Sequence, residues 1–104
     1  ESVYERAMLV ALKQKGFDVK NQVPLAVMFR GNCVGEFIVD ILVEEKVIVE
    51  LKAVKMLSPE HQAQVINYLQ ATGIEVGLLI NFGGPRLEYH RLTRTKHSGS
   101  EQNL

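Results

Sequence analysis

The chain has 104 residues, of which 46% are apolar and 23% charged, a composition typical of one globular domain with a single core. Its 12 basic residues balance its 12 acidic ones, so it lacks the strong basic excess of a dedicated nucleic-acid-binding protein. No apolar run is long enough to cross a membrane, and the single cysteine, Cys33, excludes an internal disulfide. We therefore expect no membrane partner, a cytoplasmic location, and a Cys33 that is a small buried strand residue.

Helical and strand patterns follow one another from the first residue to about residue 94. A 3.6-residue apolar period predicts a first helix over residues 1–15, which Gly16 ends with a left-handed cap. Ser58 is a favourable N-cap and Pro59 a favourable first residue for a second helix that runs to about Ala71. Strand patterns occupy residues 23–29, 33–43, 47–54, 76–82 and 87–92.

These elements have the order α-β-β-β-α-β-β, which predicts an α/β sandwich with a mixed β-sheet flanked by helices. Because a helix connects the third and fourth strands, those two strands should be parallel, with a right-handed crossover. Residues 1–94 should form one domain, and the polar residues 95–104 a flexible tail.

Two of the apolar strands carry charged residues where burial is expected. Asp40 lies on the second strand, and Glu50 and Lys52 lie on the third. Burying an ionised group is costly unless the group is paired or binds a metal. We therefore expect these three residues to be paired with one another or to bind a metal.

The length of the loop between the two strands decides whether these side chains can meet. With a three-residue loop, Val43 pairs with Val47 and Asp40 lies directly opposite Glu50. Lys52, two residues further along, then lies on the same face. A two-residue loop would place the two carboxylates on opposite faces.

Two opposed carboxylates repel each other, and a divalent cation between them would remove the repulsion. Their oxygen ligands suit Mg²⁺ or Mn²⁺, and Lys52 would stabilise the charge that develops on a phosphate during hydrolysis. The alternative is that Asp40 and Glu50 point to solvent at strand edges, with Glu50 and Lys52 forming a surface ion pair.

The second predicted helix carries a polar stripe, His61, Gln64 and Tyr68, beside its apolar docking face. Gln64 could hold a water molecule and Tyr68 could contact a phosphate, although a solvated Gln and a packing Tyr are the simpler interpretations. Basic residues in the second half of the chain favour a local basic patch, in which Lys55 and Arg86 are candidate substrate contacts.

Taken together, these residues resemble the motif of the PD-(D/E)XK nuclease superfamily. That motif has an Asp on one strand, Glu-x-Lys on the next, and often Gln-x-x-x-Tyr on the following helix; here Val39 replaces its proline. The resemblance implies a restriction-endonuclease-like fold. It also implies that Asp40 and Glu50 are metal ligands, Lys52 the catalytic lysine and Gln64 a supporting catalytic-site residue.

Longer segments are similar to the small bacterial and archaeal proteins of the GxxExxY family. The similarity covers residues 1 to about 92 and is greatest over residues 1–7, 49–53 and 77–83. Glu1 and Tyr4 match the Glu and Tyr of that signature. The resemblance implies that Glu1 is a further metal ligand and that the domain lacks an upstream helix.

The sequence therefore favours a Mg²⁺- or Mn²⁺-dependent nuclease that acts on DNA or RNA. A module that keeps the nuclease fold and binds nucleic acid or protein without cutting is the alternative, which the balanced charge favours. A homodimer that presents two sites to the two strands of a duplex is a third interpretation.

Overall fold

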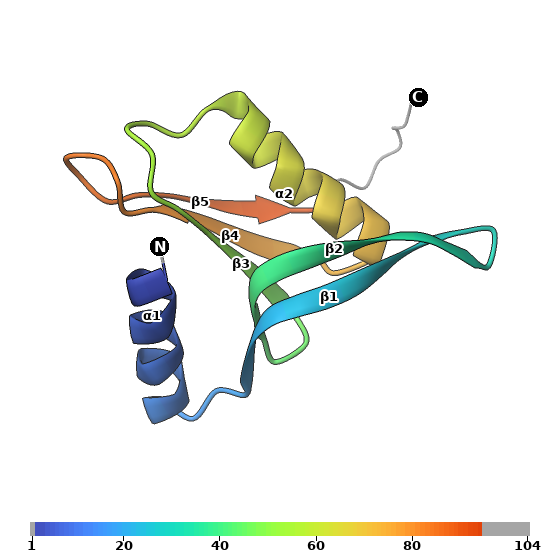
Figure 1. Cartoon of the computed structure of the whole chain (residues 1–104), viewed down its shortest axis with the longest axis horizontal. Coiled ribbons are helices and arrows are strands. Elements are labelled where there is room, and N and C mark those ends of the chain that lie inside the picture. The colour runs from blue at the N-terminus through green and yellow to red at the C-terminus, as the bar shows by residue number, and fades with distance from the viewer. Residues whose placement is uncertain (1, 95–104) are drawn as a thin grey trace.

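The computed structural model describes residues 2–94, which form two helices and five strands (Figure 1). The elements are α1 (Ser2–Gln14), β1 (Val19–Phe29), β2 (Asn32–Val43), β3 (Val47–Lys52), α2 (Pro59–Thr72), β4 (Val76–Asn81) and β5 (Glu88–Thr93). The strands form one sheet in the order β1-β2-β3-β4-β5, in which β3 and β4 are parallel and the other pairs antiparallel. The predicted element order and mixed sheet are confirmed. Within the described residues, neither helix is long and apolar enough to span a bilayer.

Most predicted element ends lie close to the observed ones, and β1 is the main exception. It begins at Val19, four residues before the predicted strand, because Val19 pairs with Val43 in the β1–β2 ladder. The polar residues 20–22 lack the alternation that marks a strand, so this pairing leaves no local signal. The predicted tail over 95–104 lies outside the described residues.

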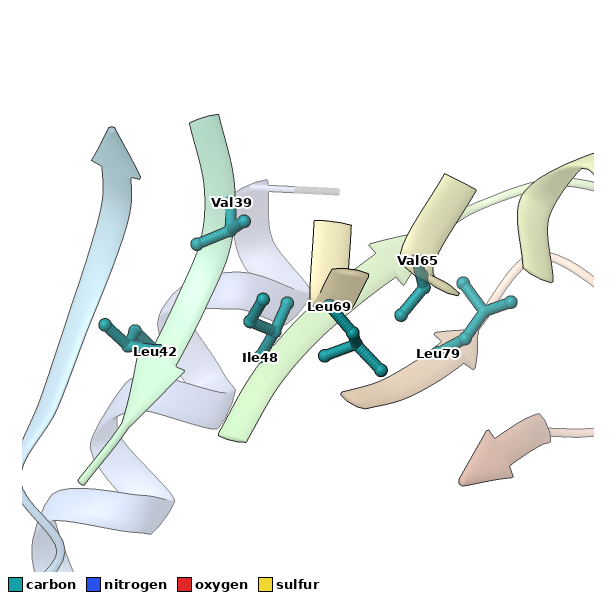
Figure 2. Packing of buried hydrophobic residues seen from close by; sticks show 6 residues of the cluster. All are labelled: Val39, Leu42, Ile48, Val65, Leu69 and Leu79. Carbon is teal, nitrogen blue, oxygen red and sulfur yellow. The ribbon is translucent and has the colours of Figure 1, made fainter. Parts of the chain in front are cut away.

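Each helix packs on its own apolar cluster, one on either face of the sheet. Figure 2 shows the cluster under α2, which comprises Val39, Leu42, Ile48, Val65, Leu69 and Leu79. The cluster under α1 comprises Val19, Ile41, Val43, Val49 and Leu51, with Met8, Leu9 and Leu12 packed against it. A Cβ atom on Gly77 would lie 2.7 Å from Val65 Cγ1, so the glycine lets α2 approach β4 closely.

The β1–β2 ladder is interrupted at Gln22 and Asp40. Val39 packs on the α2 side of the sheet and Ile41 on the α1 side, although residues two apart on a regular strand share a face. The change coincides with Gln22, which has a φ of 52° and does not pair with Asp40 in the ladder. Asp40 therefore lies at a backbone irregularity rather than within a regular strand.

Beyond this point β1 and β2 continue as a long hairpin that projects from the sheet (Figure 1). Cys33 lies near its tip and is exposed, so the predicted burial of Cys33 is wrong. The physical reason is the projection of the hairpin, which also leaves Met28, Phe29 and Val34 more than half exposed.

Candidate active site

The hairpin between β2 and β3 has the register that the sequence predicts. Its loop contains three residues, 44–46, and Val43 pairs with Val47. The ladder continues through Ile41 and Val49, which brings Asp40 and Glu50 to the next position. The two acidic residues are therefore neighbours across the two strands.

At Asp40 and Glu50, hydrogen bonds between backbone and side chain connect the two strands in place of backbone–backbone hydrogen bonds. The Asp40 N–H donates a hydrogen bond to Glu50 Oε2 at 2.8 Å, and the Leu51 N–H donates to Asp40 Oδ2 at 2.8 Å. Glu50 is only 4% exposed and Asp40 is half-buried. The alternative in which both carboxylates point to solvent is therefore wrong for Glu50, whose side chain lies inside the fold.

Lys52 lies on the same face of β3 as Glu50. Ile48 belongs to the cluster under α2 while Val49 and Leu51 belong to the cluster under α1, so the even-numbered residues of β3 face α2. Lys52 is half-buried at the last position of the strand. Its ammonium group is thus carried on the α2 side, two residues beyond the buried carboxylate.

A polar link connects α1 to the Asp40 carboxylate through Gln22. Gln22 Nε2 lies 3.0 Å from Glu5 Oε1 and 3.4 Å from Asp40 Oδ1, and Asn21 Nδ2 donates to Glu5 Oε2 at 3.1 Å. An acidic residue of the first helix therefore does approach the site, and it is Glu5. Glu1, which the resemblance assigned to the metal, lies outside the described residues.

From the other helix, Tyr68 approaches the two carboxylates. Its ring packs against Phe37 of β2, with ring centroids 4.4 Å apart. Burial raises the pKa of the Tyr68 phenol above 10.0, and the negative charges of Glu50 and Asp40 raise it further. The phenol therefore lies within the electrostatic field of both acids.

The other two members of the polar stripe on α2 have different surroundings. Gln64, one turn before Tyr68, is exposed and lines the same surface cavity as Tyr68. His61 accepts a hydrogen bond at Nδ1 from the Ser58 N–H at 2.9 Å. His61 therefore caps the start of α2, which is a structural role.

Lys55 and Arg86, the predicted substrate contacts, are brought together on the surface. Both are exposed and line one pocket, Lys55 from the β3–α2 loop and Arg86 from the β4–β5 loop. These loops begin where the parallel strands β3 and β4 end, at Lys52 and Asn81. The two cations thus lie at the edge of the sheet where β3 presents Lys52.

Asn81 is a polar centre that the sequence did not predict, because apolar residues dominate the strand around it. It is fully buried, and its Oδ1 accepts from the N–H groups of Val54 at 2.9 Å and Gly83 at 3.0 Å. Its Nδ2 donates to the Val54 carbonyl and to Glu88 Oε1, both at 2.9 Å. A polar residue at the end of an apolar strand was the available signal.

Asn81 and Glu88 together fix the loop that follows Lys52. Glu88 Oε1 also accepts from the Leu57 N–H at 3.1 Å, and these hydrogen bonds hold the pKa of the Glu88 carboxyl below its usual range. A Cβ atom on Gly83 would lie 2.4 Å from the carbonyl carbon of Ala53, so only glycine fits against this loop. The Gly83-Gly84-Pro85 turn thus serves close packing.

The donor set of the site fits a hard divalent cation. Within residues 2–94 no group of three or more His, Cys, Asp and Glu side chains is arranged to hold a metal ion. Mg²⁺ is usually held by only one or two carboxylates and completes its shell with water and substrate phosphate. The adjacent carboxylates of Asp40 and Glu50 satisfy this requirement.

Comparison with known proteins agrees with this geometry. Residues 1–92 match the PD-(D/E)XK nuclease superfamily. The fold resembles the crystal structure of SSO0001, with a TM-score of 0.67 and 16% identity over 92% of this chain and 50% of that one. It also resembles an alkaline exonuclease from Laribacter hongkongensis, with a TM-score of 0.63 and 15% identity over 90% of this chain and 56% of that one.

The chain spans about half the length of these two structures, so the likeness concerns their shared core fold. No curated protein sequence matches it. The predicted restriction-endonuclease-like sandwich is confirmed by the sheet order, by the superfamily match and by the likeness to these two structures. With the match over residues 1–92, this chain belongs to the PD-(D/E)XK nuclease superfamily.

Proposed function

We propose that this protein is a divalent-metal-dependent nuclease that hydrolyses phosphodiester bonds of DNA or RNA. The observation that carries the proposal is the pair Asp40 and Glu50, held side by side where the β2–β3 ladder ends. Two adjacent acids repel each other unless a cation is shared between them, and one of these acids is nearly fully buried. Membership of a nuclease superfamily supports the same conclusion.

In this proposal Asp40 and Glu50 would hold Mg²⁺ or Mn²⁺, and Glu1 would add a further ligand. A bound divalent ion supplies positive charge to the scissile phosphate and lowers the pKa of water, which makes water a better nucleophile. Glu5, through Gln22, holds the Asp40 carboxylate in position. The hydrogen bond from Leu51 N–H to Asp40 has the same effect from the opposite strand.

The remaining polar residues act on the substrate. Lys52 stabilises the negative charge that develops on the phosphate oxygens, because an ammonium group beside a partly dry site interacts strongly with that charge. Gln64 orients the attacking water through its carboxamide. The substrate's phosphate groups are contacted by Tyr68, Lys55 and Arg86.

We further propose that the chain belongs to the GxxExxY group of the superfamily and acts in the cytoplasm. The support is the Glu1 and Tyr4 pair of the signature, together with the single cysteine. Tyr4 stacks on Phe82 with ring centroids 4.4 Å apart, which fixes the start of α1 against the sheet.

The deciding experiment incubates the purified protein with single- and double-stranded DNA and RNA, with and without Mg²⁺ or Mn²⁺. We expect cleavage that requires the metal and falls about 100-fold or more in Asp40→Asn and in Lys52→Ala. Lys46→Ala is the matched control, because Lys46 is an exposed lysine in the β2–β3 turn. Metal-independent cleavage, or cleavage that survives in Lys52→Ala, would contradict the proposal.

A non-cutting module that binds nucleic acid or protein is the second candidate. The balanced net charge favours it, as does the lack of a three-member metal-binding group among residues 2–94. It predicts salt-sensitive binding that persists in Asp40→Asn, with no turnover by the unchanged protein. Light scattering on the same samples tests whether two copies associate.

A further inference from the structure

We propose that the cavity between β2 and α2 binds an unpaired nucleobase of the substrate strand beside the scissile phosphate. We call this cavity the base pocket. It measures 380 Å³ and is lined by Phe37, Glu60, Ala63, Gln64, Asn67 and Tyr68. This inference rests on the proposed nuclease function and adds to it a substrate class, single-stranded nucleic acid or the frayed end of a duplex.

One wall of the base pocket is aromatic. Phe37 and Tyr68 pack with centroids 4.4 Å apart and ring planes inclined by 38°, and both side chains are only half-buried. Bases stack on such rings with little dependence on sequence, because every base has a flat π face. Bases inside a duplex are already stacked on one another, so the aromatic wall favours an unpaired base.

The base pocket also presents hydrogen-bonding groups of the kind that recognise base edges. Gln64 and Asn67 are both exposed on α2, and a carboxamide offers a donor and an acceptor side by side. Ala63, one turn before Asn67 on α2, carries only a methyl group and leaves room for a flat ligand. Asn67 would recognise the edge of a base whose face lies on the aromatic rings, and Gln64 lies beside it at the side of the attacking water.

The charge of the base pocket favours a base over a phosphate. The six lining residues include no lysine or arginine, and Glu60 contributes a carboxylate. Hydrogen bonds from its own backbone amide and from the Ser58 hydroxyl hold the pKa of the Glu60 carboxyl below its usual range. This carboxylate repels phosphate and accepts hydrogen bonds from the amino or imino groups of bases.

The base pocket adjoins the proposed cleavage site through Tyr68 and β2. The phenol of Tyr68 interacts electrostatically with Glu50 and Asp40, while its ring packs on Phe37. Phe37 precedes Asp40 by three residues on the same strand, a separation of about 10 Å. When a phosphate of a nucleic-acid strand lies at the Asp40 and Glu50 carboxylates, a neighbouring base of that strand therefore lies over the base pocket.

Binding is tested in the Asp40→Asn background, so that cleavage does not consume the probe. The probe is a short single-stranded oligonucleotide in which one base is 2-aminopurine, whose fluorescence falls when it stacks on an aromatic ring. We expect quenching on binding. Phe37→Leu, which keeps apolar packing and removes the ring, should weaken binding about tenfold and restore the emission.

Two further variants make the binding test specific. Asn67→Ala alters only an exposed side chain of the base pocket and should weaken binding roughly threefold to tenfold without changing the fold. Phe29→Leu removes an exposed aromatic ring at the hairpin tip and should leave binding unchanged. The base-pocket proposal would be overturned if Phe37→Leu and Phe29→Leu bound the oligonucleotide equally well. It would also be overturned if the protein bound a blunt-ended duplex as tightly as the single strand.

A cleavage experiment separates this inference from the nuclease proposal. Abasic sites are placed one at a time along a single-stranded substrate for the unchanged protein with Mg²⁺. We expect one position near the cut at which loss of the base lowers cleavage about tenfold, and no such position in Phe37→Leu. Cleavage that is insensitive to every abasic site refutes the base pocket and leaves the nuclease standing. If nothing is cut, the nuclease proposal fails and the 2-aminopurine result still decides the pocket.

Discussion

Two polar clusters interrupt the apolar sheet, Asp40 with Glu50 between β2 and β3, and Asn81 with Glu88 between β4 and β5. In both clusters side-chain oxygens accept hydrogen bonds from backbone N–H groups, those of Asp40 and Leu51 in the first cluster and those of Val54 and Leu57 in the second. The chemical difference lies in the side chains. Asn81 donates to the Glu88 carboxylate, whereas Asp40 and Glu50 are two acceptors of the same charge.

This difference separates structure from function within one fold. A donor and an acceptor that face each other stabilise the folded state, so the Asn81–Glu88 cluster should contribute to the free energy of unfolding. Two adjacent acids reduce that free energy and gain favourable interactions when a cation binds. We therefore expect substitutions in the first cluster to change stability, and substitutions in the second to change the response to metal.

The largest stability effect should follow from Asn81→Ala. The substitution removes the fully buried side chain that hydrogen-bonds Val54, Gly83 and Glu88, and takes these partners from polar groups in a partly buried loop. We expect the free energy of unfolding to fall by about 3 kcal/mol, measured by urea denaturation. Asn67→Ala on the surface of α2 is the control and should change it by less than about 0.5 kcal/mol. If Asn81→Ala lowers the free energy of unfolding by less than about 1 kcal/mol, the Asn81–Glu88 cluster does not stabilise the fold as expected.

The next largest effect concerns metal binding to the Asp40–Glu50 cluster. At a Mn²⁺ concentration about 100 times its Kd, the unchanged protein should gain about 2.7 kcal/mol of stability. Asp40→Asn keeps an acceptor for the Leu51 N–H and removes one of the two like charges. Without metal it should be as stable as the unchanged protein or up to about 1 kcal/mol more stable.

Thermal unfolding with and without Mn²⁺ measures both quantities. Asp18→Asn is the control, because Asp18 is an exposed acid before β1 and its loss should leave the metal response intact. If Asp40→Asn still gains the full stability from Mn²⁺, the ion binds elsewhere and the contrast between the two clusters fails.

A third prediction tests the backbone packing that accompanies the Asn81 cluster. In Gly83→Ala the new Cβ would overlap the backbone of Ala53 and Val54, which cannot rotate away as a side chain can. We expect a loss of about 2 kcal/mol in the free energy of unfolding, from denaturant titration. Gly35→Ala provides the comparison, since its Cβ would meet nothing within 4 Å. Equal stability of the two variants would show that the β4–β5 loop moves aside freely.

The sequence predicted the Asp40–Glu50 cluster better than the Asn81–Glu88 cluster, for a physical reason. Asp40, Glu50 and Lys52 stand out because charges within apolar strands are costly, and the register follows from a three-residue loop. Gln22 reaches Asp40 only through a left-handed backbone conformation that no local pattern signals.

Contacts between distant segments were also beyond the sequence. The Asn81 hydrogen bonds join β4 to a loop 27 residues earlier in the chain, and the Phe37–Tyr68 contact joins β2 to α2. Such pairs depend on how the layers pack, whereas periodicity reports only which face of one element is apolar. The helices, the strands and the charged residues within the strands were therefore predictable from the sequence. The Asn81–Glu88 cluster and the base pocket were not.

The smallest predicted effect links the acidic cluster to Tyr68 and tests whether the two acids act on it together. Burial raises the pKa of the Tyr68 phenol above 10.0, and Glu50 and Asp40 raise it further. Since the unfolded chain ionises first, the contribution of this tyrosine to stability is complete below about pH 10 and is lost as pH rises through the folded pKa. Tyr68→Phe should remove that alkaline loss.

The alkaline absorbance difference between the unchanged protein and Tyr68→Phe isolates this phenol from the other tyrosines. In Asp40→Asn, or with the metal bound, the pKa of Tyr68 should move back toward 10.0 without reaching it, because burial still opposes ionisation. Glu36→Gln removes an exposed acid from the projecting hairpin and serves as the control. A Tyr68 titration that is the same in Asp40→Asn and Glu36→Gln would show that the phenol does not sense the acidic cluster. In that case Tyr68 would be a packing residue, and its ring could still form the wall of the base pocket.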